Sequence, residues 1–394
     1  MQSDKIRQLS REHLSEITVI RRHLHAHPEL SGKEYETSEV IATQLTRMRI
    51  PFRKNIAGTG LLGVIEGKNP GKTVALRADM DALPITEKNE VTYASCNEGV
   101  MHACGHDAHM ASLLGAAMIL QQLRDSFDGK ILLIFQPSEE KYPGGAIQML
   151  QEGIFENEKP DSIIAQHVLP TLETGFVGMK AGKYMASTDE IYITVIGKGG
   201  HAATPELLVD PVLISAHILV ALQSIVSRNA PPHIPTVLSF GKIVANGRTN
   251  VIPDKAEMEG TLRTFNEEWR KKAHKNITRI ATSIAESMGG EAEVFVDKGY
   301  PFLVNDERLT QRAMKYAAQY LGKEKVKELD IRMTAEDFAY FSQQAPSLMY
   351  RLGIANASKE ITSNLHTNTF DIDESSLETG MGLLAWFAIC ELAV

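Results

Sequence analysis

The sequence predicts an α/β protein in which a layered domain with a largely parallel central sheet is interrupted by a smaller α+β domain. Two observations predict this class. Between residues 61 and 153, short apolar runs of strand length alternate with stretches of helical periodicity, as in parallel sheets with crossover helices. Near Ala186 the pattern changes to strand-like runs that flank two helices, and it changes back beyond Pro301.

The first domain is expected to begin with two helices. One ends near His27, where the motif HPELSG breaks the pattern, and the next covers residues 36–48. The following elements are predicted strands over 61–67, 73–80 and 130–137 and predicted helices over 107–123 and 144–153.

The insertion is expected to contain four strands and two helices. They are strands over 189–200, 236–247, 255–265 and 291–299, and helices over 211–228 and 267–289. A helix over 307–322, a strand over 347–354 and a helix over 377–392 then return the chain to the first domain. The predicted boundaries are 1–186 and 299–394 for the first domain and 187–298 for the insertion.

The amino-acid composition indicates which partners and which cellular location to expect. The 394 residues include 49 acidic and 41 basic ones, a net charge of -8, and the basic residues are dispersed, so we expect no nucleic-acid partner. The N-terminus is charged without a hydrophobic signal core, and no apolar run approaches the roughly 18 to 20 residues that span a bilayer. Three cysteines are too few for a disulfide framework. We expect a cytoplasmic protein that does not bind membranes.

The densest group of reactive side chains is the segment MHACGHDAHM, residues 101–110. If the segment is extended, alternate side chains share a face, and His102, Cys104 and His106 project toward one point. Asp107 can cap the helix that follows. A thiolate and imidazoles at this spacing suit zinc, manganese or cobalt better than magnesium. The alternative is a group of histidines at a solvated helix start beside a buried thiol.

A second group follows the apolar run ILLIFQP, which delivers Glu139 and Glu140 to the carboxyl end of a strand. Active sites of open α/β sheets lie at that edge. In an extended backbone the two carboxylates point in opposite directions, so one can bind a metal while the other faces a water molecule. His167 and His366 are interpreted as lying at similar strand ends. Each of these residues alone also fits a structural or solvated role.

Taken in order, the motifs resemble one known family. RRHLHAHPELS, ALRADMDALPI, MHACGHDAHM, FQPSEE, QHVLP, GKGGHAATP, NVIPD, GTLRTF, TAEDFAYF and LHTNTFDIDE occur here as they do in the amidohydrolase subgroup of peptidase family M20. The resemblance runs nearly from end to end. It implies a metallopeptidase-like catalytic domain with an inserted lid domain that also mediates dimerisation.

The resemblance also implies a binuclear metal site. The implied ligands of two divalent ions, which could be manganese, zinc, cobalt or nickel, are Cys104, His106, Glu140, His167 and His366, with the Cys104 thiolate as the bridge. Glu139 becomes the general base. Asp81 corresponds to a carboxylate beside the metals, and Asp79 stands where the wider family has a metal-binding histidine.

In the insertion, the resemblance assigns roles to three residues. His201 corresponds to a histidine that contacts the scissile carbonyl, often from the partner subunit of a dimer, and stabilises the oxyanion. Asn250 and Arg263 correspond to substrate-binding residues, with the Arg263 guanidinium holding a free carboxylate. We therefore expect a homodimer formed through the insertion.

The expected reaction is hydrolysis of the amide bond of a small N-acyl amino acid to a carboxylate and a free amino acid. Two alternatives stay open: a dipeptidase or carboxypeptidase on the same scaffold, and a non-catalytic metal-bound sensor of amino-acid conjugates. A dinucleotide site is not expected, because GTGLLG at 58–63 leads into a strand-like run instead of a helix. His23 and His27 share helical spacing, but a structural role is favoured because Pro28 ends the helix.

Overall fold

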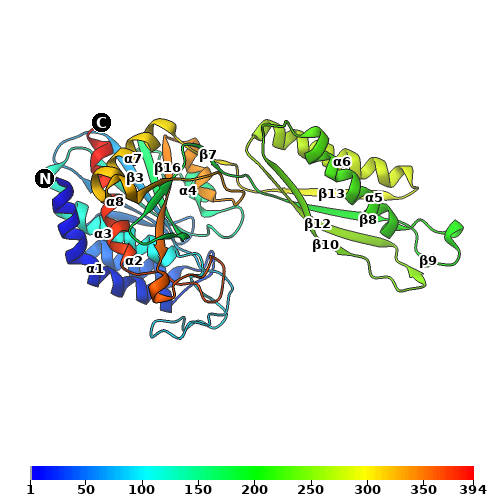
Figure 1. Ribbon diagram of the computed structural model, residues 1–394, viewed down its shortest axis with the longest axis horizontal. Helices are drawn as coiled ribbons and strands as arrows, with labels where there is room; N and C mark the ends of the chain where they lie inside the picture. Colours follow the sequence, from blue (N-terminus) through cyan, green and yellow to red (C-terminus); the bar gives the residue numbers. More distant parts are fainter. Residues whose placement is uncertain (1) are drawn as a thin grey trace. The chain divides into compact units, whose positions relative to one another are not determined.

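The computed structural model describes residues 2–394 and divides into two compact units, and Figure 1 labels many of their helices and strands. Unit 1 comprises residues 2–184, 304–331 and 337–394, and unit 2 comprises residues 185–303 and 332–336. The first two boundaries fall within short strands, β7 (Gly182–Met185) and β14 (Leu303–Asn305). Each unit has its own apolar core.

Unit 1 is built on an eight-stranded sheet with the strand order β1-β2-β4-β3-β5-β16-β6-β15. These strands are β1 (Phe52–Ile56), β2 (Gly60–Glu66), β3 (Thr73–Asp79), β4 (Lys130–Gln136), β5 (Ser162–Glu173), β6 (Val177–Met179), β15 (Val326–Glu328) and β16 (Ser347–Ala355). The four central strands, β4, β3, β5 and β16, are parallel, whereas β1 and β2 form an antiparallel edge. The predicted α/β class is confirmed.

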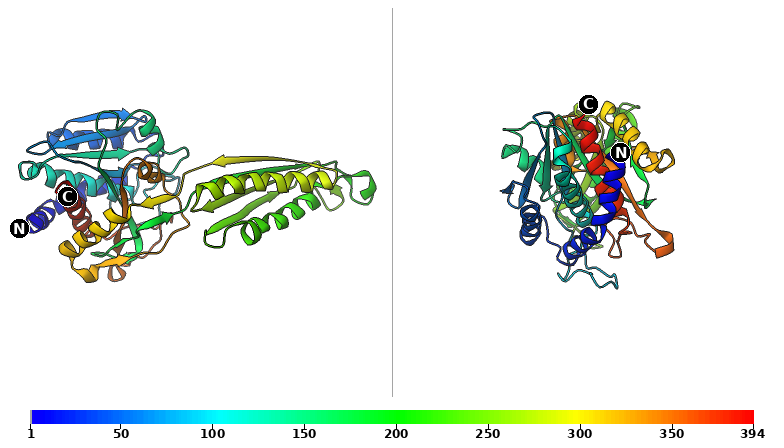
Figure 2. Two further views of the ribbon diagram at one scale, coloured as in Figure 1. Left: turned by 90° about the horizontal axis from the view of Figure 1, so that it is seen from above. Right: turned by 90° about the vertical axis from the view of Figure 1, so that its left-hand side faces the viewer.

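The helices of unit 1 supply most of its core. They are α1 (Gln2–Ala26), α2 (Tyr35–Arg47), α3 (His106–Gln122), α4 (Gly145–Gln151), α7 (Glu307–Leu321) and α8 (Ser376–Leu392). Helix α3 is buried from His106 to Leu120, because it packs against both α1 and α8. Figure 2 shows these two terminal helices, blue and red, side by side.

Three strands of the eight-stranded sheet, β1, β6 and β15, were not predicted from the sequence. In β1, three consecutive residues, Arg53–Asn55, are exposed, so this edge strand has no apolar alternation. Strands β6 and β15 have only three residues each. Short or polar edge strands are stabilised by a neighbouring strand, and their own sequence carries little pattern.

Unit 2 is a four-stranded antiparallel sheet, β10-β12-β8-β13, with two helices on one face. Its elements are β8 (Asp189–Ile196), α5 (Pro211–Ser224), β10 (Thr236–Val244), β12 (Lys255–Thr264), α6 (Glu267–Ser287) and β13 (Glu291–Lys298). A separate two-stranded ladder joins β9 (Gly200–His201) to β11 (Val251–Ile252). Ile193 of β8, Ile218 of α5 and Ile277 of α6 meet in the core.

A buried ion cluster ties α6 to the sheet of unit 2. The fully buried Arg270 guanidinium donates to Asp189 at 2.6 Å, and His274 Nε2 lies 2.7 Å from the same carboxylate. Burial raises the pKa of Asp189, but hydrogen bonds from His274 and Arg270 and the charge of Arg270 outweigh burial. The net pKa of Asp189 is therefore below its ordinary value of 3.8.

The expectation that no apolar run reaches membrane-spanning length is contradicted by helix α5. The helix continues through a π-helical turn, and Pro211–Asn229 together are long and apolar enough to cross a membrane by length and composition alone. Those criteria are weak evidence, because the core helix of a folded domain also meets them, and Ile214, Ile218 and Leu222 do fill the core of unit 2. The Asp210 carboxylate caps this helix.

Candidate metal centre and active site

The candidate site lies at the carboxyl edge of the parallel strands of unit 1. Strand β3 ends at Asp79 and is followed by Asp81, and β4 ends at Gln136, just before Glu139 and Glu140. His167 lies in β5 beyond Ala165, where the pairing of β5 with β3 stops. Parallel strands leave a crevice at this edge, and side chains from separate loops converge there.

The structure brings the predicted ligands together. In each of three overlapping groups, one ligand atom per residue lies within 4.8 Å of the others. The groups are Cys104, His106 and His167; Cys104, Glu140 and His366; and His106, Glu139 and Glu140. Cys104 is common to the first two groups.

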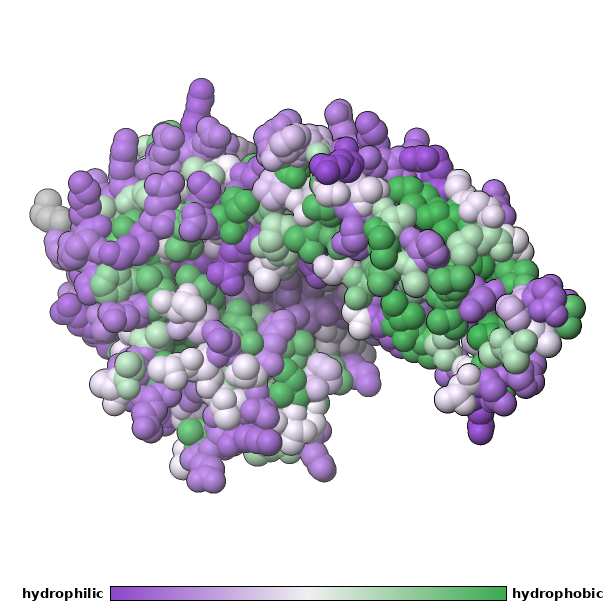
Figure 3. Space-filling view, turned by 45° about the vertical axis from the view of Figure 1, so that its right-hand side comes forward, coloured by the Kyte–Doolittle hydropathy of each residue, from purple (hydrophilic) through white to green (hydrophobic). Residues whose placement is uncertain are grey.

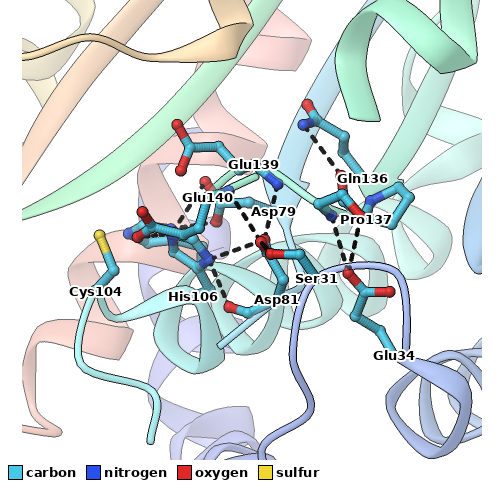
Figure 4. A network of polar contacts seen from close by, with 12 residues as sticks. Ser31, Glu34, Asp79, Asp81, Cys104, His106, Gln136, Pro137, Glu139 and Glu140 are labelled. Carbon is cyan, nitrogen blue, oxygen red and sulfur yellow. Dashed lines mark hydrogen bonds and ion pairs between the residues drawn. The ribbon is translucent and has the colours of Figure 1, made fainter. Parts of the chain in front are cut away.

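Individual distances agree with this grouping. Cys104 Sγ lies 3.6 Å from His167 Nε2, and His366 Nε2 lies 3.3 Å from Glu140 Oε1. The same Glu140 oxygen is 4.0 Å from His106 Nε2. Figure 4 shows Cys104, His106, Glu139 and Glu140 around one space.

The ring nitrogens of two histidines are oriented as metal ligands require. His106 Nδ1 lies 2.8 Å from the Asp81 backbone oxygen, and His167 Nδ1 lies 2.9 Å from the Val168 backbone oxygen. A carbonyl only accepts, so both Nδ1 atoms carry a proton, and Nε2 is the ring atom that each histidine could offer to a metal. Such a hydrogen bond is the usual companion of a metal-ligating histidine.

Buried polar atoms without partners point to the same conclusion. In the part of the chain that the structure describes, His106 Nε2 and Glu140 Oε1 are buried and have no hydrogen-bond partner. Burying such atoms without a hydrogen bond costs free energy, which a cation between them would offset. The nitrogen, sulfur and carboxylate donors suit a first-row divalent transition metal, so the residues present fit a metal centre.

The electrostatics of the site also favour a cation. Burial raises the pKa of the Cys104 thiol, and the negative charges of Glu140, Glu139 and Asp79 raise it further. Burial alone would lower the pKa of His106, but Asp79, Asp81 and Glu140 raise it to about 10. Negative charge from nearby carboxylates contributes to both shifts, and bound cations would neutralise that charge while stabilising the thiolate.

Asp81 holds the segment that carries both glutamates. Its Oδ1 accepts the Glu139 N–H at 3.0 Å, and its Oδ2 accepts the Glu140 N–H at 2.9 Å and the Ser31 hydroxyl at 2.6 Å (Figure 4). Burial raises the pKa of Asp81, but hydrogen bonding and the charge of His106, together with these donors, lower it overall. Asp81 therefore stays ionised and anchors the candidate base.

Asp79 and His109 form a second buried pair. Asp79 accepts from His109 Nδ1 at 2.6 Å and from Arg77 at 2.7 Å, while His109 Nε2 accepts the Val168 N–H at 2.9 Å. Asp79, His106 and His109 also have ligand atoms within 4.8 Å of one another. Because Asp79 and His109 already satisfy each other, they are better suited to holding the neighbouring ligands than to binding an ion themselves.

Two interpretations of the HACGHDAH segment are wrong. The segment is not extended, because Gly105 has φ +82° and α3 begins at His106. Cys104 and His106 meet because of this turn, whereas His102 belongs to none of the ligand groups among the described residues and its ring centre lies 6.5 Å from that of His25. Asp107 does not cap α3: its carboxylate accepts from Arg21 and lies 2.8 Å from His25.

The backbone around the other ligands also differs from expectation. Ser138 has φ +54°, so the chain turns before Glu139 and Glu140 and is not extended. His366 is not at a strand end but in the irregular segment between β16 and α8, with φ +61°, and its N–H donates to the Ala103 carbonyl at 2.8 Å. His167 lies inside β5, which runs on to Glu173.

In unit 2, two of the three predicted residues lie together. His201 in β9 pairs with Val251 in β11, and the Asn250 backbone oxygen accepts the Ala202 N–H at 3.1 Å. Both side chains are exposed, and His201 Nδ1 accepts the Ala203 N–H at 3.0 Å. His201 Nε2 is therefore the ring atom that carries the proton.

Arg263 lies at the other end of the sheet of unit 2. The register pairs Lys255 with Ile196 near the β9–β11 ladder and Leu262 with Asp189 next to Arg263. Half-buried Arg263 donates to Thr261 Oγ1 at 3.2 Å and lines an open hollow of about 430 Å³. Seven residues of strand, at about 3.3 Å each, separate the two ends by more than 20 Å.

Several residues of the site were missed by sequence reasoning. Fully buried Arg77 links Asp79 to Asp337, which lies in the TAEDFAYF motif and also accepts the Ala146 N–H. Glu34 accepts the Ser138 N–H at 2.9 Å. The available signal was an arginine directly after the apolar run VAL in the predicted strand TVALRAD, because buried charges are rare unless they are paired.

Sequence comparison with known proteins gives matches over most of the chain. Residues 75–389 match the profile described as Peptidase family M20/M25/M40. An N-acyl-L-amino acid amidohydrolase of Geobacillus stearothermophilus is 42% identical over 77% of this chain and 82% of its own length. Thermostable carboxypeptidase 2 of Saccharolobus solfataricus is 40% identical over 95% of this chain and 94% of its own length.

Structural comparison agrees with the sequence matches. The Bacillus subtilis YXEP protein, described as a dinuclear metal binding peptidase from the M20 family, superposes with a TM-score of 0.83 and 33% identity. The match covers 97% of this chain and 99% of that protein.

Proposed function

This chain belongs to peptidase family M20, and we propose that it is a metal-dependent amidohydrolase that cleaves N-acyl amino acids to a carboxylate and a free amino acid. The observation that carries the proposal is the buried Glu139 carboxylate, which lies within 4.8 Å of ligand atoms of His106 and Glu140. A base next to a metal centre is the arrangement that amide hydrolysis needs.

We propose two divalent cations at this centre, held by the five residues Cys104, His106, Glu140, His167 and His366. When bound, the cations polarise the amide carbonyl and lower the pKa of a water molecule toward neutrality. The mixed nitrogen, sulfur and oxygen donors are compatible with manganese, zinc, cobalt or nickel.

Glu139 acts as the general base and then as the general acid. Its carboxylate takes the proton of the attacking water and returns it to the nitrogen of the leaving amino acid. Two features suit Glu139 to this role. Its side chain is buried, with the residue 7% exposed, and the Asp81 carboxylate accepts a hydrogen bond from its backbone N–H. The acyl carboxylate and the free amino acid are the products.

The proposed roles of unit 2 require two copies of the chain. The His201 Nε2–H stabilises the oxyanion and Asn250 contacts the substrate, while Arg263 binds the free carboxylate of the amino acid. His201 and Arg263 lie at opposite ends of the same sheet, so one copy of unit 2 does not offer both to one small substrate. We propose that the partner subunit supplies His201 and Asn250.

The surface of unit 2 supports a homodimer formed through this unit. On α5, Val212, Leu213 and Val220 are 44%, 50% and 73% exposed. Ile243 is 48% exposed on β10, an edge strand with unpaired backbone groups. Figure 3 shows a broad apolar area, in green, on unit 2. A second copy that covers α5 and β10 would remove this apolar area from water.

The proposed location is the cytosol. Cys96, Cys104 and Cys390 are all free, and a reducing compartment keeps such thiols available for a metal.

The test uses the metal-loaded protein and Glu139→Gln with a panel of acetyl, benzoyl and indolyl amino acids, with and without a chelator. We expect hydrolysis by the wild type, its loss with the chelator, and a fall in turnover of at least about 100-fold in Glu139→Gln with unchanged metal content. Hydrolysis of peptides with a free N-terminus, and not of N-acyl amino acids, would favour a carboxypeptidase or dipeptidase, as the carboxypeptidase relative suggests. Binding without turnover would favour a sensor.

A further inference from the structure

A buried ionic network connects two segments that carry proposed metal ligands. Its centre is Arg21 on α1, whose side chain is 0% exposed. Arg21 Nε donates to Asp107 Oδ2 at 2.7 Å, and Arg21 Nη2 donates to Asp371 Oδ1 at 2.7 Å. Asp107 directly follows the ligand His106, and Asp371 lies five residues after the ligand His366.

The network has further members that hold Asp107 and Asp371 in place. His25 Nδ1 lies 2.8 Å from Asp107 Oδ2, and its Nε2 lies 3.1 Å from Glu87. The Tyr93 hydroxyl donates to Asp371 Oδ2 at 2.8 Å, and the Tyr93 ring lies 5.1 Å from the Arg21 guanidinium carbon. RRHLHAHPELS, which contributes Arg21 and His25, thus contacts both ligand segments without being a ligand itself.

The two ligand segments depend on this network to different degrees. His106 begins α3, which is buried along its first four turns and held by its own packing. His366 lies in an irregular segment between Ala355 and Ser376, in a left-handed conformation, with its side chain 53% exposed. The loss of one anchor therefore displaces His366 more than His106.

We propose that Arg21 is a positioning residue for the metal centre: it fixes the segment that carries His366 against the first turn of α3 and thereby sets the affinity for the ion that His366 binds. The inference rests on the proposed metal centre. Arginine is suited to this position because its planar fork reaches both carboxylates at once, which a lysine ammonium cannot do with the same geometry.

The test compares Arg21→Lys with Arg270→Lys, its matched control. Both replace a fully buried guanidinium that bridges carboxylates, but the Arg270 network lies in unit 2 and contains no proposed ligand. Metal is removed with a chelator, Mn²⁺ is titrated back by calorimetry, and thermal unfolding is recorded in parallel.

We expect two Mn²⁺ ions per wild-type chain. Arg21→Lys should keep one affinity and weaken the other by about 10- to 100-fold, the usual effect of losing a residue that holds a ligand in place. Arg270→Lys should lower the melting temperature and leave both affinities unchanged. Tyr93→Phe, which removes one hydroxyl, should act as Arg21→Lys does but less strongly, and it serves if Arg21→Lys does not fold.

A double variant separates positioning from general stability. His366→Ala should itself weaken one affinity, and adding Arg21→Lys to it should weaken that affinity no further, because both changes act through the same ligand. The inference is overturned if Arg21→Lys and Tyr93→Phe leave both Mn²⁺ affinities unchanged, as Arg270→Lys should, or weaken both Mn²⁺ affinities equally. If the wild type binds no Mn²⁺, the proposed metal centre fails instead.

Discussion

Replacing Asp81 with asparagine should remove the anchor of the proposed base. An asparagine side chain has only one acceptor oxygen. If that oxygen takes the place of Oδ2, it keeps the hydrogen bonds from the Glu140 N–H and the Ser31 hydroxyl. The NH2 group then takes the place of Oδ1 and faces the Glu139 N–H. Two donors then face each other across the 3.0 Å that now separates the Glu139 nitrogen from Asp81 Oδ1.

The expected loss of stability and of kcat follows from the loss of the hydrogen bond between the Glu139 N–H and Asp81 Oδ1. A hydrogen bond to a charged group stabilises a protein by about 1.5–3 kcal/mol, so the free energy of unfolding should fall by roughly that amount. If the same energy holds Glu139 in its productive position, kcat should fall about 10- to 100-fold, because 1.36 kcal/mol corresponds to tenfold in rate.

The assays are guanidinium unfolding followed by circular dichroism, and steady-state hydrolysis of an N-acyl amino acid with metal content measured on the same sample. Asp161→Asn is the matched control, because its exposed carboxylate also accepts a backbone N–H, that of Thr73 at 2.8 Å. If Asp81→Asn were no less stable than Asp161→Asn and kept its kcat, Asp81 would not anchor Glu139.

Cys104→Ser should weaken the retention of both ions by more than about 100-fold, since a ligand is lost and not merely a residue that supports one; equilibrium dialysis measures this. Because the pKa of Asp189 is lower in the folded than in the unfolded chain, the ionised carboxylate stabilises the folded state above about pH 4. This stabilisation is lost as the pH falls through the folded-state pKa. Asp189→Asn should abolish this dependence in unit 2, measured by acid titration of tryptophan fluorescence. Gly145→Ala would place a Cβ 1.8 Å from the Pro137 oxygen and should destabilise unit 1 by about 1–3 kcal/mol in guanidinium unfolding.

Each of these expectations has a control. Unchanged ion retention in Cys104→Ser would exclude the bridging thiolate. The acid titration uses Trp386→Phe as background, which leaves Trp269 of unit 2 as the single tryptophan, and an acid transition that persists in Asp189→Asn would contradict the linkage. Gly241→Ala adds a Cβ with no heavy atom within 4 Å, so equal destabilisation by the two alanines would refute the steric argument.

The residue types of the candidate metal centre could be predicted from the sequence, but the geometry of their arrangement could not. A thiol, imidazoles and paired carboxylates placed after apolar runs identify a soft, anionic site at the carboxyl edge of a sheet. The extended backbone assumed for that reasoning was wrong at Gly105 and Ser138, which both have positive φ. Cys104 and His106 meet because the chain turns between them, and His102 lies outside the ligand groups of the described residues.

The sequence by itself determined the α/β alternation and the main strands and helices, because local periodicity reports which side of each element is buried. It also contained the residue types that we propose as metal ligands. Only the tertiary structure decided which distant side chains meet. Arg21 and Asp371 are 350 residues apart and in contact, and Cys104 and His167 are 63 apart. Such contacts depend on how whole elements pack, and no local pattern of apolar and polar residues encodes that packing.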